Sequence, residues 1–257
     1  MDEGERVNKN FIAGEWVEGK RATTDLNPSD LDDRIGDFAL ADRSQTNDAI
    51  SAARQAAAAW RDAGIQQRAQ ALDLIGNTIL ARKQELGTLL SREEGKTLPE
   101  GIGEVERAGQ IFKFFAGETL RIPGVRIDSV RRGVEAEVTR EPVGVVGIIT
   151  PWNFPIAIPA WKIAPALAFG NAVVFKPAAL VPATARALAE IIAAAGLPAG
   201  AFNLVVGAGQ DVGETIVESP QVDAVSFTGS VAIGRAILVK TAQRQARVQL
   251  EMGGKNP

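Results

Sequence analysis

The chain has 257 residues, of which 46% are hydrophobic and 23% charged, with a formal net charge of -3. This composition is typical of a globular protein with one large or two small domains, and it leaves no broad basic surface for a nucleic-acid backbone. The sequence contains no cysteine and no histidine, which excludes disulfides, thiolate or imidazole metal sites and serine–histidine triads within these residues.

We expect a cytoplasmic protein without a nucleic-acid or membrane partner. The first ten residues lack the basic start and apolar run of a signal peptide. The longest apolar stretch, residues 143–172, is interrupted by several prolines, Asn153 and Lys162, so it is not typical of a transmembrane helix.

The first half of the chain is predicted to be mostly helical. An apolar and aromatic pattern at residues 10–17 indicates a peripheral strand pair, and a Pro/Asp-rich loop is expected after it. Apolar residues then recur at helical spacing. The predicted helices run through residues 44–60, 72–80, 86–90 and 105–115.

Residues 124–139 change to strand-like alternation on either side of the turn Arg131-Arg132-Gly133. This pattern predicts a protruding β-hairpin. An isolated ribbon leaves two open edges, which another part of the chain or another subunit must cover. We favour a subunit, and therefore expect a homo-oligomer.

After residue 141, five apolar runs alternate with helix-length segments. The runs cover residues 143–149, 172–175, 202–206, 224–227 and 248–250, and the helices are expected at 158–169, 182–195, 211–218 and 231–241. Runs this apolar are buried on both faces, so the fold class is α/β, with a doubly wound, mostly parallel, Rossmann-like sheet. Ligands in such sheets bind where the strands end.

Polar residues follow several of these runs. Asn153 lies in the proline-stiffened loop after the first run, where it is either a turn residue or a rigid amide donor for an oxyanion. Lys176 ends the second run, as a solvated terminus or as a donor to a nucleotide.

The fourth and fifth apolar runs also end in residues that are suited to ligand binding or catalysis. Gly229 is expected to permit a tight turn, and Ser230 to cap a helix whose free N–H groups would seat a pyrophosphate. Gly209 lies in a weaker glycine-rich turn, and no GxGxxG follows a strand. Glu251 either pairs with Lys255 or acts as a general base.

Taken together, the motifs PWNFP, FKPA, FTGS with Gly234 and LEMGGKNP resemble the aldehyde dehydrogenase superfamily, in order and spacing, as do EGK and WKIAPALAFGN. The resemblance implies that Asn153 is an oxyanion-stabilising amide and Glu251 the base that activates water. It also implies that NAD or NADP binds in a crevice. The implied cofactor-binding residues are Thr150, Pro151, Trp152, Asn153, Lys176, Ala178, Ala179, Gly209, Phe227, Thr228, Gly229, Ser230 and Ile233.

In that family a cysteine thiolate attacks the aldehyde, and the sequence contains none. We therefore expect residues 1–257 to be the NAD(P)-binding part of such an enzyme, with 124–139 as its oligomerisation hairpin, without the catalytic domain and inactive alone. A non-catalytic nucleotide-binding or oligomerisation module is the main alternative. A relative that makes an acyl-coenzyme A is a second one, against which Glu251 argues.

Two finer expectations follow from the resemblance. Many NAD-preferring relatives have a glutamate at the position of Ala179, so alanine here suggests that NADP is tolerated or preferred. Residues 140–175 most resemble dehydrogenases of α-ketoglutaric semialdehyde, with succinic semialdehyde enzymes next, although the latter usually have arginine in place of Trp161. The full enzyme would be a dimer or tetramer.

Overall fold

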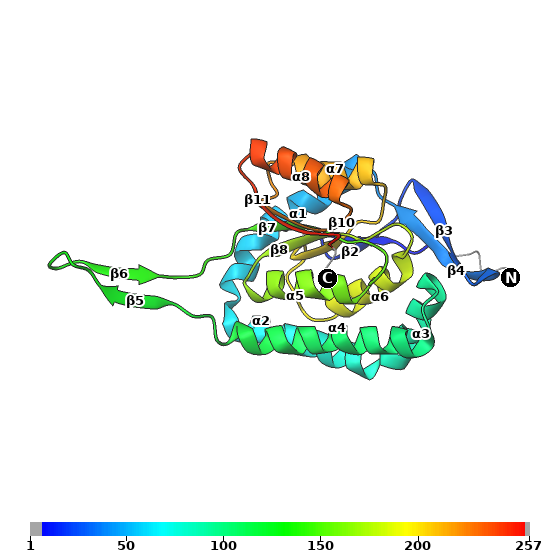
Figure 1. Cartoon of the computed structure of the whole chain (residues 1–257), viewed down its shortest axis with the longest axis horizontal. Coiled ribbons are helices and arrows are strands. Elements are labelled where there is room, and N and C mark those ends of the chain that lie inside the picture. The colour runs from blue at the N-terminus through cyan, green and yellow to red at the C-terminus, as the bar shows by residue number, and fades with distance from the viewer. Residues whose placement is uncertain (1–6, 255–257) are drawn as a thin grey trace.

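A central seven-stranded sheet organises the computed structural model, which describes residues 7–254 (Figure 1). The strand order is β11-β10-β7-β8-β9-β1-β2. The strands are β1 (Asn10–Ile12), β2 (Glu15–Val17), β7 (Val145–Ile149), β8 (Ala172–Lys176), β9 (Phe202–Leu204), β10 (Ala224–Gly229) and β11 (Arg247–Met252). Neighbours from β11 to β9 are parallel, and β1 pairs antiparallel with β9 and β2. The mostly parallel sheet and the N-terminal strand pair are confirmed.

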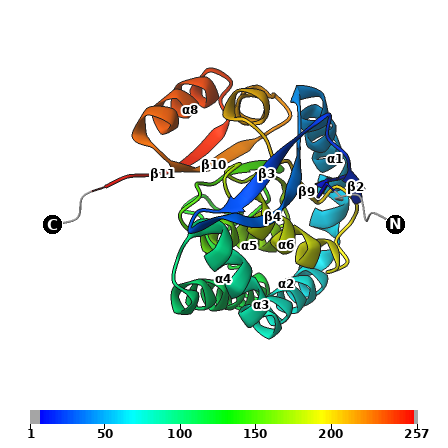
Figure 2. The same ribbon diagram turned by 90° about the vertical axis from the view of Figure 1, so that its right-hand side faces the viewer.

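Helices cover both faces of the sheet (Figure 2). They are α1 (Arg43–Asp62), α2 (Gly64–Ala81), α3 (Lys83–Glu94), α4 (Leu98–Thr119), α5 (Ala157–Ala168), α6 (Pro182–Ala193), the π-helical turn η1 (Gly209–Gly213), α7 (Glu214–Glu218) and α8 (Val231–Gln243). One face carries α1, α7 and α8, and the other carries α2 to α6 (Figures 1 and 2). The doubly wound arrangement is therefore confirmed.

Strand alternation explains why both faces are apolar. In β8, Val173 and Phe175 enter the core shared with α5 and α6, whereas Val174 enters the core under α1 and α7. Successive side chains of a strand point to opposite faces, so an unbroken apolar run satisfies both layers at once. This two-sided burial extends to the end of the strand.

The expectation of a loop after the first strand pair is wrong. Residues 21–40 form a second ribbon, β3 (Arg21–Asn27) and β4 (Asp30–Leu40), joined by a tight turn and interrupted by register shifts near Leu26. The ribbon is polar over most of its length, which hides the alternation of a strand. Buried Phe38, Ala39 and Asp25 anchor it to the body of the protein.

The predicted hairpin is confirmed as β5 (Val125–Asp128) and β6 (Glu135–Val138), which extend away from the body (Figure 1). Gly133 has a φ of 78° and supplies the left-handed residue of its turn. Val125, Ile127 and Val138 are all more than half exposed. Among residues 7–254, no helix combines the length and the apolar character needed to cross a membrane.

Candidate active site

The ends of four parallel strands meet at the edge of the sheet opposite the hairpin. Ile149 of β7 lies beside Lys176 of β8 and beside Phe227 of β10, and Thr228 of β10 lies beside Glu251 of β11. The register therefore brings together the segments that the sequence marked as functional. This is the edge where open α/β sheets bind ligands.

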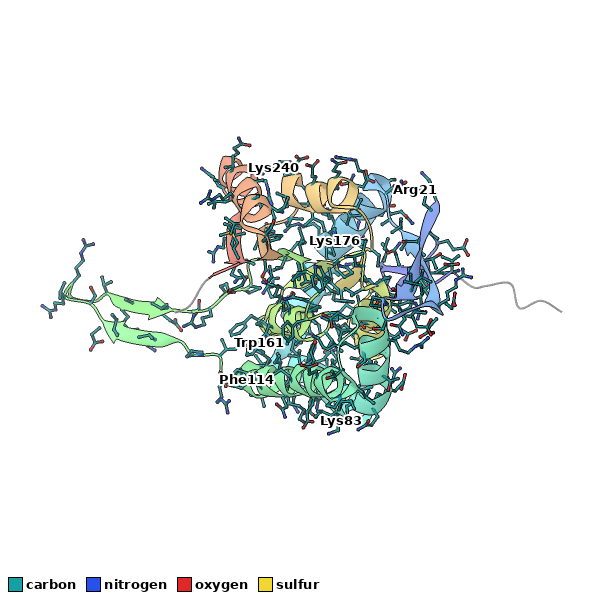
Figure 3. All side chains as sticks on the ribbon, turned by 45° about the vertical axis from the view of Figure 1, so that its right-hand side comes forward. Arg21, Lys83, Phe114, Trp161, Lys176 and Lys240 are labelled. Carbon is teal, nitrogen blue, oxygen red and sulfur yellow. The ribbon has the colours of Figure 1, made fainter. Side chains whose placement is uncertain are left out.

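Lys176 is buried at this edge, with 7% of its surface exposed, so the solvated-terminus interpretation is wrong. Figure 3 shows it in the centre of the molecule, between the helical layers. Its Nζ donates to the carbonyl of Pro177 at 3.0 Å and forms no ion pair within residues 7–254. Burial lowers the pKa of Lys176 to about 8. A buried cation without a counter-charge is suited to an anionic ligand.

A second unsatisfied group lies next to this lysine. Thr150 is buried, and its Oγ1 has no hydrogen-bond partner within the described part of the chain. Its backbone N–H donates to the carbonyl of Lys176 at 3.2 Å, so the backbones of the two residues are adjacent at this edge. Buried hydroxyls normally have a partner, so a polar ligand would complete this site.

The N-terminus of α8 supplies the third part of the edge. Ser230 is its N-cap, and its hydroxyl accepts from the N–H of Ile233 at 3.4 Å, which confirms the predicted cap. The tight-turn explanation of Gly229 is wrong, because Gly229 belongs to β10 and its φ is not positive. A Cβ at this position would lie 2.5 Å from Cζ of Phe227, so close packing explains the glycine.

The remaining predicted cofactor residues surround these three features. Phe227 is buried in the core below Gly229, and Pro151 and Ala178 are half-buried at the strand ends. Exposed positions on the surrounding loops and helix ends are occupied by Trp152, Ala179, Gly209 and Ile233.

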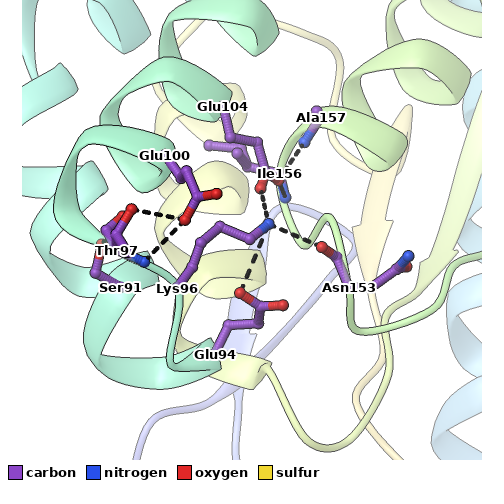
Figure 4. Close-up of polar contacts among 9 residues, drawn as sticks. All are labelled: Ser91, Glu94, Lys96, Thr97, Glu100, Glu104, Asn153, Ile156 and Ala157. Carbon is purple, nitrogen blue, oxygen red and sulfur yellow. Dashed lines mark hydrogen bonds and ion pairs between the residues drawn. The ribbon is translucent and has the colours of Figure 1, made fainter.

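The Asn153 loop is held by a buried ion pair that the sequence reasoning missed (Figure 4). Lys96 Nζ lies 2.7 Å from Glu104 Oε2 and donates to the carbonyl of Asn153 at 2.8 Å. Glu104 Oε1 accepts from the backbone N–H groups of Ile156 and Ala157, each at 3.1 Å, at the start of α5. The loop is thereby fixed from both sides.

The amide of Asn153 remains free within this loop. Its side chain is exposed and makes no hydrogen bond with residues 7–254, so the interpretation as a self-satisfied turn residue is wrong. Lys96 also lies 4.1 Å from the ring centroid of Phe154, which restrains the next residue. A rigid loop with a free amide has the features that an oxyanion donor needs.

Two buried carboxyl groups tie the β3 ribbon to α3 and α6 beside this loop. Glu93 accepts from the backbone N–H groups of Ala183 at 2.5 Å and Thr184 at 3.0 Å, at the start of α6. Burial raises the pKa of Glu93 well above its usual value, and burial raises the pKa of Asp25 to about 6. Sequence reasoning gave no signal for this pair, which connects β3 and α3 to the first turn of α6.

Glu251 opens onto a cavity of about 600 Å³ between β10, β11 and α5. Lys162, Trp161 and Thr228 also line it, whereas Asn153 does not. Burial lowers the pKa of Lys162 to about 8, against the opposing effect of the Glu251 charge. The alternative partner of Glu251, Lys255, lies outside the described residues.

Comparison with known protein families identifies the family of this chain. The model of the aldehyde dehydrogenase family matches residues 16–257, and the chain belongs to this family. The α-ketoglutaric semialdehyde dehydrogenase of Bacillus subtilis (strain 168) is 43% identical over 96% of this chain and 51% of the relative. A succinate-semialdehyde dehydrogenase [NADP(+)] of Escherichia coli (strain K12) is 38% identical over 96% of this chain and 52% of the relative.

Solved structures agree with the fold. Betaine aldehyde dehydrogenase from Staphylococcus aureus in complex with NAD+ superimposes with a TM-score of 0.94 and 35% identity, over 99% of this chain and 51% of that one. An NADP-dependent enzyme of E. coli gives a TM-score of 0.95 and 37% identity, over 100% and 53%. The chain spans about half the length of the relatives it matches.

Proposed function

We propose that this chain provides the cofactor-binding part, an oxyanion donor and a general base to an NAD(P)-dependent aldehyde dehydrogenase. The observation that carries the proposal is that the ligand-binding edge of the sheet holds both buried Lys176, which has no carboxylate partner within residues 7–254, and the unsatisfied hydroxyl of Thr150. Family membership is consistent with this edge as a dinucleotide site.

The residues at the edge fit a dinucleotide. Lys176 would bind the ribose or its phosphate, and Ser230 with the N-terminal N–H groups of α8 would bind the pyrophosphate. Thr150 and Trp152 would line the crevice from the β7 side. When bound, the nicotinamide supplies the hydride acceptor.

Two chemical roles fall to this chain's own residues: stabilising an oxyanion and accepting a proton. The free amide of Asn153 would donate to the oxyanion that forms when a nucleophile adds to the aldehyde carbonyl. The carboxylate of Glu251 would accept a proton from the water that releases the carboxylic acid. The 257 residues contain no cysteine, so the thiolate nucleophile of this mechanism must come from elsewhere.

NADP is the cofactor that the local charges favour. Lys176 has no carboxylate partner within residues 7–254, and exposed Ala179 three residues further adds no negative charge. A 2'-phosphate would supply the counter-charge that the lysine lacks, whereas a ribose hydroxyl would not.

The substrate we assign is a dicarboxylic semialdehyde such as α-ketoglutaric semialdehyde. Support comes from two relatives named for that activity, at 43% and 41% identity over nearly the whole chain. Trp161 rather than arginine lines the cavity beside Glu251, which disfavours succinic semialdehyde. The exposed apolar residues of the β5–β6 hairpin support a homo-oligomer.

Titration of the purified 257-residue chain with NADP and with NAD, followed by tryptophan fluorescence, tests the proposal. We expect saturable binding with NADP tighter, abolished or strongly weakened by Lys176→Met and unaffected by Lys83→Met on the far surface. An aldehyde oxidation assay on the same sample should show no turnover, because no cysteine is present. A folded chain that binds neither dinucleotide would refute the cofactor site, and tighter binding of NAD would refute the NADP preference.

A further inference from the structure

Polar side chains occupy one face of the sheet where β10 and β11 run side by side. Ser226 lies opposite Gln249 and Thr228 opposite Glu251, and all four line the cavity beside α5. Strand residues two apart share a face, so the pattern follows directly from the sequence. A polar stripe on a sheet whose other strands are apolar on this side calls for an explanation.

Lys162 of α5 reaches this stripe from the opposite wall of the cavity. Its Nζ donates to Ser226 Oγ at 2.9 Å and to Gln249 Oε1 at 3.0 Å. Ser226 Oγ also donates to Gln249 Oε1, at 2.6 Å. Both Lys162 and Ser226 donate to the Gln249 amide, and within that amide only the oxygen can accept a hydrogen bond. The amide is therefore fixed in one of its two orientations.

With its oxygen committed, the Gln249 amide must present its nitrogen to Glu251. Nε2 donates to Glu251 Oε1 at 2.7 Å. The second carboxylate oxygen of Glu251 has no partner within residues 7–254, and Glu251 is one of the residues that line the cavity. One oxygen of the carboxylate is held, and the other remains available to water.

We infer that Gln249 is a positioning residue for Glu251, with Lys162 and Ser226 fixing its amide so that one carboxylate oxygen faces the cavity. The inference rests on the proposed function, in which Glu251 activates water. Gln249 itself touches no reacting atom in this scheme. Its contribution is to select one side-chain rotamer of an exposed glutamate that would otherwise populate several.

The rotamers of Glu251 can be measured directly in the 257-residue chain. Three-bond NMR couplings of labelled glutamate should show one dominant rotamer about χ1 and χ2 in the wild type. In Gln249→Leu we expect rotamer-averaged couplings, and in Gln249→Glu the same loss, because like charges repel. Ser226→Ala should give a smaller loss, because Lys162 still holds the amide oxygen. Gln243→Leu, an exposed position on α8, is the matched control and should leave the couplings unchanged.

Averaged couplings in the wild type, or a single rotamer retained in Gln249→Leu, would overturn the inference. Urea unfolding shows whether each variant is folded. If Gln249→Leu is unfolded, Ser226→Ala and Gln249→Glu still test the inference. The NMR experiment requires neither cofactor nor turnover. A failure of dinucleotide binding would therefore remove the proposed function without changing this result, and a failure of the NMR test would leave cofactor binding intact.

Discussion

Replacing Lys176 by methionine should stabilise the fold at neutral pH while it removes a cofactor contact. Lys176 is buried at the end of β8, and burial lowers its pKa from 10.5 to about 8. At about 1.4 kcal/mol per pKa unit, burying the charged form costs roughly 3 kcal/mol. Methionine has a similar length and no charge. The substitution also removes the hydrogen bond to Pro177, and this loss offsets about 1 kcal/mol of the stability gained.

The pH dependence distinguishes this mechanism from improved packing. The pKa of Lys176 is lower in the folded chain than in the unfolded chain, so below about pH 8 both states are protonated and the full penalty applies. Between about pH 8 and 10.5 the folded state loses its proton first, and the stability of the wild type rises. The advantage of the methionine variant is therefore largest below pH 8 and shrinks toward pH 10.5.

Urea unfolding at pH 7 and at pH 10 measures both the stability gained by removing the buried charge and its dependence on pH. We expect Lys176→Met to be more stable than wild type by about 2 kcal/mol at pH 7, after the lost hydrogen bond, with a smaller difference at pH 10. Lys83→Met, which removes a partly exposed lysine and its surface ion pair with Glu106, is the control and should change little at either pH. A stability difference that is absent at pH 7, or equal at the two pH values, would refute the reasoning.

Three further substitutions test other parts of the site. Gly229→Ala should destabilise the chain by about 1–3 kcal/mol in urea unfolding, because its Cβ would overlap the ring of Phe227; an unchanged midpoint would contradict the packing argument. Glu104→Ala should cost about 3–5 kcal/mol, because it leaves Lys96 buried without its main partner, and a loss below 1 kcal/mol would argue against that role. Ala179→Glu should weaken NADP binding on the order of tenfold relative to NAD in fluorescence titrations; an unchanged ratio would count against the proposed phosphate site.

The sequence predicts the sheet well because its signal is local. The runs of β7 and β8 are apolar on both faces, those of β10 and β11 carry an apolar residue at every second position, and helix-length segments separate the runs. Period and length are therefore enough to recognise them. The β5–β6 hairpin is equally visible, because residues 125–138 alternate around a glycine turn. The β3–β4 ribbon escapes the same reasoning because its alternation is carried by a few buried residues in a polar segment.

The site is only partly visible in the sequence, because its assembly depends on contacts between distant residues. Lys96 meets Asn153, 57 residues away, and Lys162 meets Gln249, 87 residues away. Neither lysine has a local pattern that marks its partner. The alternation of Ser226 with Thr228 and of Gln249 with Glu251 is a usable signal, since four polar residues on paired strands predict a polar face.

Lys176 shows how fold and function are linked in one residue. The apolar run of β8 that makes the strand predictable also determines how deeply its last residue is buried, because the two helical layers extend to the end of the strand. A lysine there is destabilising unless something compensates its charge, and none of the described residues does so. Sequences without a need for this charge would gain stability from an apolar residue, so its presence favours an anionic ligand over a purely structural role.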